Sequence, residues 1–368
     1  MRAFRNLFTV IAIGGLAMTG LTGCDDLAGK KEYLVTANKP NSVHLIDAET
    51  GQVVNSFPIP GDGAPGTLSV SPDGDVAYVI TNHMETISGI NLDTGEQVFR
   101  ADASYDNVRV KHMFAMAVSR DGEEIFSFQT PVRILPGEYQ VMDTQIAVYK
   151  TDAGIDAKPV RVFPAPRQIS VLAPSTDGKL IYGLGPSVFA FDAKTGEIVS
   201  AHPLREWGRP NYGVPDILAA WPHYEVANVL TAPYFVPRTD KAPDAPDAFK
   251  TGLLTIDLKT GEVTTEDFEN TSHLIFSSVL NPVNRNEAYG VYTKLTKIDR
   301  VANVVSNRID MEHTYYAINV SHDGKTIYMG GTMEDVVAHN AETLERTWAV
   351  KLPGGGDQGL SSLRVVRR

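Results

Sequence analysis

The chain has 368 residues and is acidic, with 44 Asp and Glu against 33 Lys and Arg, and it contains a single cysteine. An acidic surface repels phosphate backbones, so nucleic acids are not expected partners. One cysteine cannot form an internal disulfide, so a hydrophobic core must stabilise the fold.

The first predicted element is a secretory signal peptide at residues 1–23. Arg2 and Arg5 form a basic head, and residues 7–21 form an uncharged apolar run that contains several small residues. This run is shorter than the roughly 20 apolar residues of a membrane-spanning helix. Its removal takes away two arginines and no acids, which makes the mature chain more acidic still.

The only cysteine, Cys24, follows this signal directly. Residues 21–24, Leu-Thr-Gly-Cys, resemble the bacterial lipobox, in which the cysteine thiol receives a diacylglycerol and becomes the mature N-terminus. The alternative is an ordinary signal peptide that is cleaved near a cysteine. Asp25 and Asp26 resemble a signal for retention at the inner membrane. We therefore predict a periplasmic protein anchored to the inner membrane through lipidated Cys24, with residues 24–31 as a tether.

Two turn motifs alternate along the rest of the chain. An Asp- or Asn-rich turn that commonly ends in Gly follows a hydrophobic strand, as in a tight hairpin, at residues 46–52, 90–96, 148–154, 191–197, 256–262, 298–304 and 339–345. The second motif, S-x-D-G, occurs at residues 71–74, 119–122, 175–178 and 321–324, with a degenerate copy in 281–292. Four antiparallel strands in each unit of roughly 42 residues are typical of a β-propeller blade.

The insertions and the chain ends complete this prediction. Two units are longer than the rest, with insertions at residues 130–145 and 234–249. The first unit lacks its innermost strand, and residues 360–366 form a strand with nothing after it. The last strand can complete the first blade and so remove an open sheet edge. We predict an all-β fold, a single seven-bladed propeller of four-stranded blades over residues 32–368.

Aromatic side chains are dense in residues 211–238 and 313–321. We predict that they face a partner subunit or wall a pocket, because loops at one end of a propeller often carry its binding surface. The alternative is that they pack between blades. The candidate residues are Trp221, His223, Tyr224, Tyr234, Phe235, Tyr315 and Tyr316.

The sequence contains no motif that assigns chemistry to the chain itself. H-E-x-x-H, C-x-x-C, G-x-S-x-G and the P-loop are absent, and the absence of C-x-x-C-H excludes a covalently attached c-type haem. The nine histidines are scattered, with no local pair at metal-ligand spacing. Only residues 344–350 resemble the tryptophan-containing turns of pyrroloquinoline-quinone alcohol dehydrogenases. We therefore predict no catalytic, cofactor-binding or metal-binding residue on this chain.

Several segments carry a family likeness. Taken in order, residues 32–366 resemble the β subunit of quinohemoprotein amine dehydrogenase, through the segments at 130–133, 165–169, 180–185, 214–221, 251–262, 315–324 and 352–364. The chain departs from this family at its N-terminus, because a lipobox is not expected of every member.

The resemblance implies a periplasmic heterotrimer that oxidises primary amines to aldehydes. A small γ subunit would carry a cysteine tryptophylquinone, and an α subunit would carry two c-type haems and pass electrons onward. The β subunit would be a seven-bladed propeller that supports the γ subunit and helps to wall the substrate pocket. The chain would then belong to an oxidoreductase acting on CH–NH2 groups without itself being catalytic.

Two alternatives stay open from the sequence. The chain could be a stand-alone periplasmic lipoprotein propeller that binds a protein or peptide. It could also be a lactonase-like propeller enzyme with a metal ion in its central channel.

Overall fold

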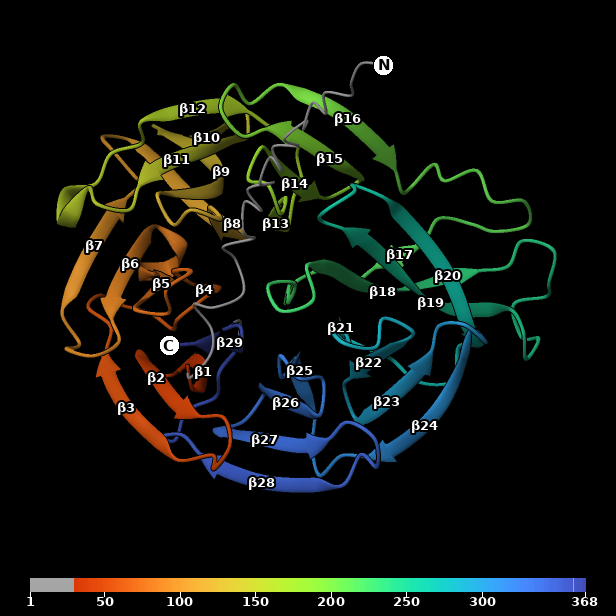
Figure 1. The fold of residues 1–368 in the computed structure, drawn as a ribbon. Coiled ribbons are helices and arrows are strands. Elements are labelled where there is room, and N and C mark those ends of the chain that lie inside the picture. Colours follow the sequence, from red (N-terminus) through yellow and green to blue (C-terminus); the bar gives the residue numbers. More distant parts are fainter. Residues whose placement is uncertain (1–29, 360) are drawn as a thin grey trace, which may run out of the picture.

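The computed structural model describes residues 30–359 and 361–368, and it is a ring of seven β-sheets around a central channel (Figure 1). The all-β seven-bladed propeller predicted from the repeats is confirmed. The predicted signal peptide, Cys24 and most of the predicted tether lie outside the described residues.

Each blade contains four antiparallel strands, and they are given below in order from the channel to the outer rim. Blade 1 contains β29 (Arg364–Arg367), β1 (Glu32–Asn38), β2 (Ser42–Asp47) and β3 (Val53–Pro58). Blade 2 contains β4 (Leu68–Val70), β5 (Val76–Thr81), β6 (Thr86–Asn91) and β7 (Gln97–Asp102). Blade 3 contains β8 (Val108–Val118), β9 (Glu124–Leu135), β11 (Gln145–Lys150) and β12 (Arg161–Pro164), and β10 (Glu138–Val141) extends it.

The remaining four blades follow the same order. Blade 4 contains β13 (Val171–Pro174), β14 (Leu180–Leu184), β15 (Ser187–Asp192) and β16 (Ile198–Pro203). Blade 5 contains β17 (Asp216–Ile217), β18 (Val229–Pro237), β19 (Phe249–Asp257) and β20 (Val263–Asn270). Blade 6 contains β21 (Ser277–Leu280), β22 (Glu287–Val291), β23 (Lys294–Asp299) and β24 (Val304–Asp310). Blade 7 contains β25 (Tyr315–Val320), β26 (Thr326–Gly331), β27 (Asp335–Asn340) and β28 (Arg346–Lys351).

The ring closes as the sequence predicts. β29 pairs antiparallel with β1, from Glu32 opposite Arg367 to Val35 opposite Arg364, and it is the innermost strand of blade 1. The first blade therefore combines strands from both ends of the chain. This pairing covers the edge of β1 that would otherwise be open.

The repeated turn motifs have a local physical cause. In the first D-x-x-T-G turn, Asp47 Oδ1 accepts hydrogen bonds from the backbone N–H groups of Glu49 (3.0 Å) and Thr50 (2.9 Å). Gly51 then adopts a positive φ of 74°, a conformation that favours glycine. In the first S-x-D-G hairpin, Ser71 Oγ donates to Asp73 Oδ1. The same serine-to-aspartate bond recurs in the three other S-x-D-G hairpins, at Ser119, Ser175 and Ser321.

The two predicted insertions lengthen existing hairpins. Residues 130–145 form the end of β9 together with β10, and β10 is exposed along its whole length. Residues 234–249 lengthen the hairpin between β18 and β19. Neither insertion adds a separate domain.

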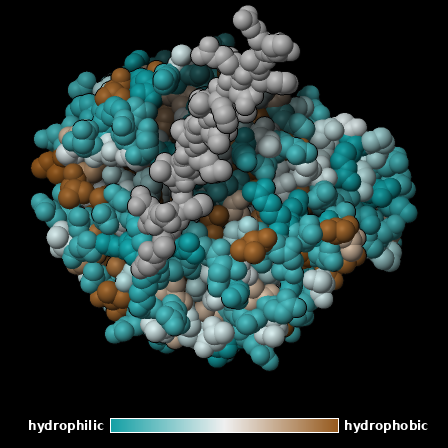
Figure 2. All heavy atoms as spheres, in the orientation of Figure 1, coloured by the Kyte–Doolittle hydropathy of each residue, from teal (hydrophilic) through white to brown (hydrophobic). Residues whose placement is uncertain are grey.

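The hydrophobic core lies between neighbouring blades. Between blades 3 and 4, for example, it contains Phe126, Phe128, Phe163 and Phe191. The outer strands contact solvent, and β16 is exposed at every residue. The face shown in Figure 2 is mostly hydrophilic, with hydrophobic residues in small separate groups. Within the described part of the chain, no helix is long and apolar enough to cross a membrane.

A loop of blade 5 reaches into the centre of the ring. Residues 218–228, between β17 and β18, project into the central opening (Figure 1), and we name them the plug loop. Arg364 of β29 holds this loop from the other side of the channel. Its Nη1 donates to Pro222 O (2.7 Å) and pairs with Glu225 Oε1 (2.6 Å), while its Nε donates to Leu68 O (2.8 Å). One buried side chain thus joins blades 1, 2 and 5.

Candidate functional site

The inner strands run between two faces of the ring. Tyr316 lies near the start of β25, and His322 follows its last residue, Val320. Six residues of extended strand span about 20 Å, so these two side chains mark opposite faces. We name the face at Tyr316 the aromatic face and the face at His322 the basic face.

Four partly buried aromatic rings stack on the aromatic face, and we name them the aromatic cluster. Trp221 comes from the plug loop of blade 5, Phe276 and Tyr292 from blade 6, and Tyr316 from blade 7. The ring centroids of Phe276 and Tyr292 are 3.9 Å apart and the planes are 11° from parallel. The centroid distances are 5.0 Å between Trp221 and Tyr316 and 5.1 Å between Phe276 and Tyr316.

Hydrogen bonds beneath the rings hold the aromatic cluster in place. Ser277 Oγ donates to Tyr316 O (2.6 Å), and the backbone N–H of Tyr315 donates to Tyr292 O (2.9 Å). Trp221 Nε1 is buried and has no hydrogen-bond partner among the described residues, so stacking rather than this donor positions the indole. The cluster is therefore fixed by the junction of blades 6 and 7.

Two of the predicted partner-facing tyrosines lie inside the blades. Tyr234 is completely buried, and its hydroxyl donates to Asp267 Oδ1 (2.5 Å) and accepts from Arg209 Nη1 (3.1 Å). Tyr315 is also buried, and its hydroxyl donates to Asp335 Oδ2 (2.8 Å). The pKa of both phenols is raised, mainly by burial and secondly by the hydrogen-bonded carboxylate. These two tyrosines pack in the interior, as the blade-packing alternative expects.

Two other candidate residues belong to the interior of the plug loop. His223 is 1% exposed, and its Nε2 accepts a hydrogen bond from the backbone N–H of Leu363 (3.3 Å). Burial lowers the pKa of His223 well below its usual value, with the nearby Arg364 charge as the second cause, so this imidazole is neutral. Tyr224 is also buried, and burial raises its pKa.

Of the seven candidate residues, two meet in the partly buried aromatic cluster, and Tyr224 and Tyr234 share one buried core cluster instead. Trp221 and Tyr316 meet in the aromatic cluster, whereas Phe235 lies partly buried against the core between blades 5 and 6. Phe276 and Tyr292 were missed by the sequence analysis. In the structure Phe276 directly precedes β21 and Tyr292 directly follows β22, and the sequence analysis singled out neither position. That the cluster faces a partner stays a prediction.

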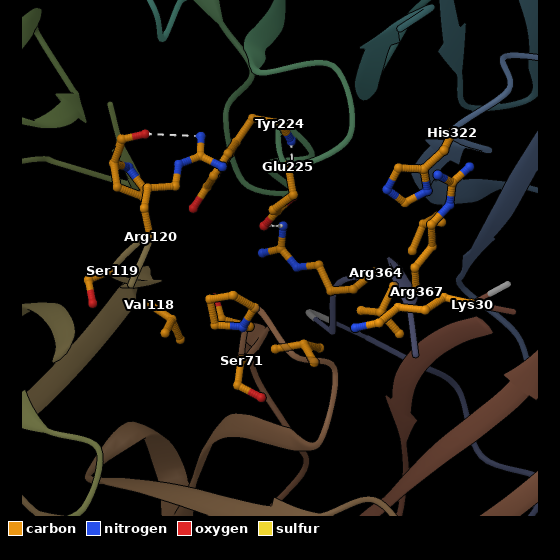
Figure 3. A pocket seen from close by; sticks show the side chains of 16 residues that line it. Lys30, Ser71, Val118, Ser119, Arg120, Tyr224, Glu225, His322, Arg364 and Arg367 are labelled. Atoms are coloured by element: carbon orange, nitrogen blue, oxygen red, sulfur yellow. Dashed lines mark hydrogen bonds and ion pairs between the residues drawn. The ribbon is translucent and has the colours of Figure 1, made fainter. Parts of the chain in front are cut away.

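A second site lies at the basic face. A cavity of about 260 Å³ opens beside the plug loop and β29 (Figure 3). Its lining includes the charged residues Lys30, Arg120, Glu225, Arg364 and Arg367 together with His322. In Figure 3 the Arg120 and Arg364 side chains extend toward the cavity from different walls. We name this cavity the basic pocket.

The sequence analysis did not predict the basic pocket. Arg120 and His322 occupy the same place in two repeats, the second position of S-R-D-G and S-H-D-G. In the other two copies this position is Pro72 or Thr176. An arginine or histidine at this position was the only local signal, and the two side chains line one cavity only because the ring brings their hairpins together.

The acidic and histidine residues show no metal site. In residues 30–359 and 361–368, no group of three or more His, Cys, Asp or Glu side chains is arranged to hold a metal ion.

No protein-family model and no curated protein matches the chain. Solved structures do share its fold. A protein of unknown function from Desulfotomaculum acetoxidans has a TM-score of 0.58 and 11% identity, covering 91% of this chain and 99% of that one. Hydrazine synthase from Kuenenia stuttgartiensis has a TM-score of 0.54 and 14% identity, covering 85% and 90% of the two chains.

A third structure is the dihydro-heme d1 dehydrogenase NirN, with a TM-score of 0.53 and 13% identity, covering 91% of this chain and 75% of that one. At identities this low, the likeness shows a shared fold alone. The chain is therefore a seven-bladed β-propeller, and the solved structures that share this fold include a hydrazine synthase and a dihydro-heme d1 dehydrogenase.

Proposed function

We propose that this chain is the propeller subunit of a periplasmic quinohemoprotein amine dehydrogenase, anchored to the inner membrane through lipidated Cys24. It would support the small quinone-bearing γ subunit and help to wall the pocket in which primary amines are oxidised to aldehydes. The sequence resemblance over residues 32–366 supports this proposal. The description of the structural neighbour NirN as a dehydrogenase is compatible with it.

The observation that carries the proposal is the aromatic cluster. Tryptophan and tyrosine are enriched in the central, tightly bound part of protein interfaces. Here Trp221, Phe276, Tyr292 and Tyr316 are partly exposed and come from three blades of one rigid ring. A surface that is already ordered loses little conformational freedom when a partner binds. Aromatic faces also suit the apolar and ammonium parts of an amine.

In this proposal the three subunits have different roles, because no cofactor-binding residue is predicted on this chain. The quinone and the two haems would reside on the γ and α subunits, where they would accept and transfer the electrons of the amine. The propeller would position the γ subunit and exclude water at its aromatic face. The alternative, a stand-alone lipoprotein that binds a protein or peptide, uses the same face without any redox partner.

Purification of the native protein from the membrane fraction of its own organism tests the proposal. We expect a haem-absorbing subunit and a small quinone-bearing chain to co-elute, with amine-dependent reduction of a dye. A protein that elutes alone, with neither haem absorbance nor dye reduction, would refute the complex and favour the stand-alone binding propeller. Mass spectrometry of the same sample tests diacylglycerol on Cys24.

A further inference from the structure

We propose that the basic pocket binds a phosphate group, either as a free anion or as the headgroup of an anionic phospholipid. This proposal does not depend on the amine dehydrogenase assignment, because the pocket lies on the opposite face from the aromatic cluster. It rests on the charge balance of the lining, the available donors, the size of the cavity and its place near the N-terminus.

The lining has more positive charge than its carboxylates neutralise. Glu225 is the carboxylate of the lining, and it pairs with Arg364 (2.6 Å). Glu32, outside the lining, is shared between His322 (2.6 Å) and Arg367 (3.6 Å). Arg120 forms no ion pair with any described residue and instead donates to two carbonyl oxygens, those of Pro174 and Ser175. An excess of cationic groups in a recess of an acidic protein concentrates positive potential at one place.

Two guanidinium groups retain donors for a ligand. Arg120 uses Nε and Nη2 for its carbonyl bonds, and its Nη1 has no hydrogen-bond partner among the described residues. Arg364 is 2% exposed, and its Nη2 has only a long contact of 3.5 Å with Ser362 Oγ. Guanidinium groups bind phosphate oxygens through paired N–H donors, and Lys30 adds an ammonium group to the lining.

The size of the cavity fits a phosphorylated group rather than a larger ligand. A volume of about 260 Å³ corresponds to roughly nine water molecules at about 30 Å³ each. This leaves room for a phosphate and a glycerol-sized substituent. It is below the range of about 300–1,000 Å³ for typical drug-sized ligand sites.

The place of the pocket in the chain favours a lipid headgroup as the source. Lys30 lines the pocket and lies six residues after Cys24. Six residues span at most about 22 Å even when fully extended. A lipid on Cys24 would therefore hold the basic face, and not the aromatic face, next to the bilayer.

Isothermal titration calorimetry on the detergent-solubilised, full mature chain tests the proposal. One arm adds inorganic phosphate, and the other adds dihexanoyl-phosphatidylglycerol below its micelle concentration, with dihexanoyl-phosphatidylcholine as the comparison. Binding of inorganic phosphate identifies a free-anion site. Binding of phosphatidylglycerol in preference to both inorganic phosphate and phosphatidylcholine identifies a lipid-headgroup site.

Matched variants assign binding to the pocket. We expect Arg120→Gln to weaken binding about tenfold or more, because it removes charged donors, and Lys30→Ala to weaken it less. Two controls should bind like the wild type: Arg167→Gln, whose guanidinium also donates to a carbonyl, and the exposed Lys194→Ala. If no probe binds, or if Arg120→Gln and Lys30→Ala both bind like the wild type with unchanged melting temperatures, the proposal is wrong.

Discussion

At the scale of single residues, charged side chains join strands within one blade. Glu124 of β9 accepts hydrogen bonds from Arg161 of β12 (2.8 and 2.6 Å) and forms an ion pair with Lys150 of β11 (3.1 Å). The hydrogen bonds from Arg161 are the main cause that lowers the pKa of Glu124 to about 2 from a usual value of 4.5, with Lys150 adding to the effect against partial burial. This carboxylate therefore links protonation to the stability of blade 3.

Because the pKa of Glu124 is lowered in the folded protein, its contribution to stability depends on pH. Because the folded-state pKa of Glu124 is below its unfolded value, its stabilisation is present above about pH 4.5 and is lost as the pH falls toward about 2. We expect Glu124→Gln to lower the free energy of unfolding at pH 7 by up to about 3 kcal/mol, and by less at pH 3. Urea denaturation at both pH values measures this.

The exposed Glu345→Gln is the control, and it should change the free energy of unfolding little at either pH. An equal loss of stability at pH 7 and pH 3 in Glu124→Gln would show that the ion pair is not responsible.

At the scale of elements, the plug loop depends on the last strand of the chain. Arg364 of β29 is the contact between them, through Glu225 and the carbonyl oxygen of Pro222. Because Arg364 is buried, its removal leaves these acceptors without their donor. The centre of the ring is thus held by residues that are far apart in the sequence.

We expect Arg364→Met to lower the free energy of unfolding by at least about 2 kcal/mol, since it breaks a buried pair and keeps most of the side-chain volume. Urea denaturation at pH 7 measures the change. The comparison variant is Arg346→Met, whose ion pair with Glu312 is exposed and is worth less than about 1 kcal/mol. Equal effects of the two substitutions would contradict a structural role for the Arg364 contact.

The sequence separation of the contacting residues explains which elements can be predicted from the sequence. The hairpin turns follow from neighbours within five residues, such as Asp47 and Thr50, so their pattern is visible in the sequence. The ion pair between Arg364 and Glu225 joins positions 139 residues apart, so no local sequence pattern predicts it. Strand pairing and ring closure were predictable because they follow from repeat counting.

The candidate sites were predicted less well for a related reason. A tyrosine can bury its ring and still bond its hydroxyl, so composition alone does not separate Tyr234, which is buried on Asp267, from Tyr316, which stacks in a partly exposed cluster. Phe276 and Tyr292 join that cluster only through the packing of blades 5, 6 and 7. The sequence singled out residues 211–238 and 313–321 by their aromatic content, and the packing of the ring determines which of these side chains meet.

At the scale of the whole molecule, the two faces of the ring differ in chemistry. One has the aromatic cluster, and the other has the basic pocket and the first described residues of the chain. The plug loop reaches both, with Trp221 at one face and Glu225 at the other. A partner on the aromatic face and a membrane at the basic face could therefore be in contact with the same molecule at once.

The aromatic face gives a prediction about assembly. We expect Trp221→Ala and Tyr316→Ala each to weaken retention of the γ subunit, or to raise KM for a primary amine, by about fivefold or more, because truncation of a central interface aromatic typically costs more than about 1 kcal/mol. Co-purification and steady-state kinetics measure the two effects.

Tyr139→Ala on the exposed strand β10 is the matched control, and it should leave assembly and kinetics unchanged. Normal assembly and kinetics in both cluster variants would mean that these rings serve only to pack the blades together.

The pairing of β1 with β29 has a mechanical consequence. The backbones of Lys31 and Arg368 are hydrogen-bonded to each other in both directions (3.0 and 3.1 Å), so the two ends of the described chain meet at one point. A molecule tethered through Cys24 would receive any pulling force at this point. The hydrogen bonds of an antiparallel pair lie across the strands, so a pull that lifts Lys31 away from Arg368 would load them one after another, first those between Lys31 and Arg368 and then those of the pair formed by Glu32 and Arg367. The strand pair that closes the ring would then yield to force before the other blades.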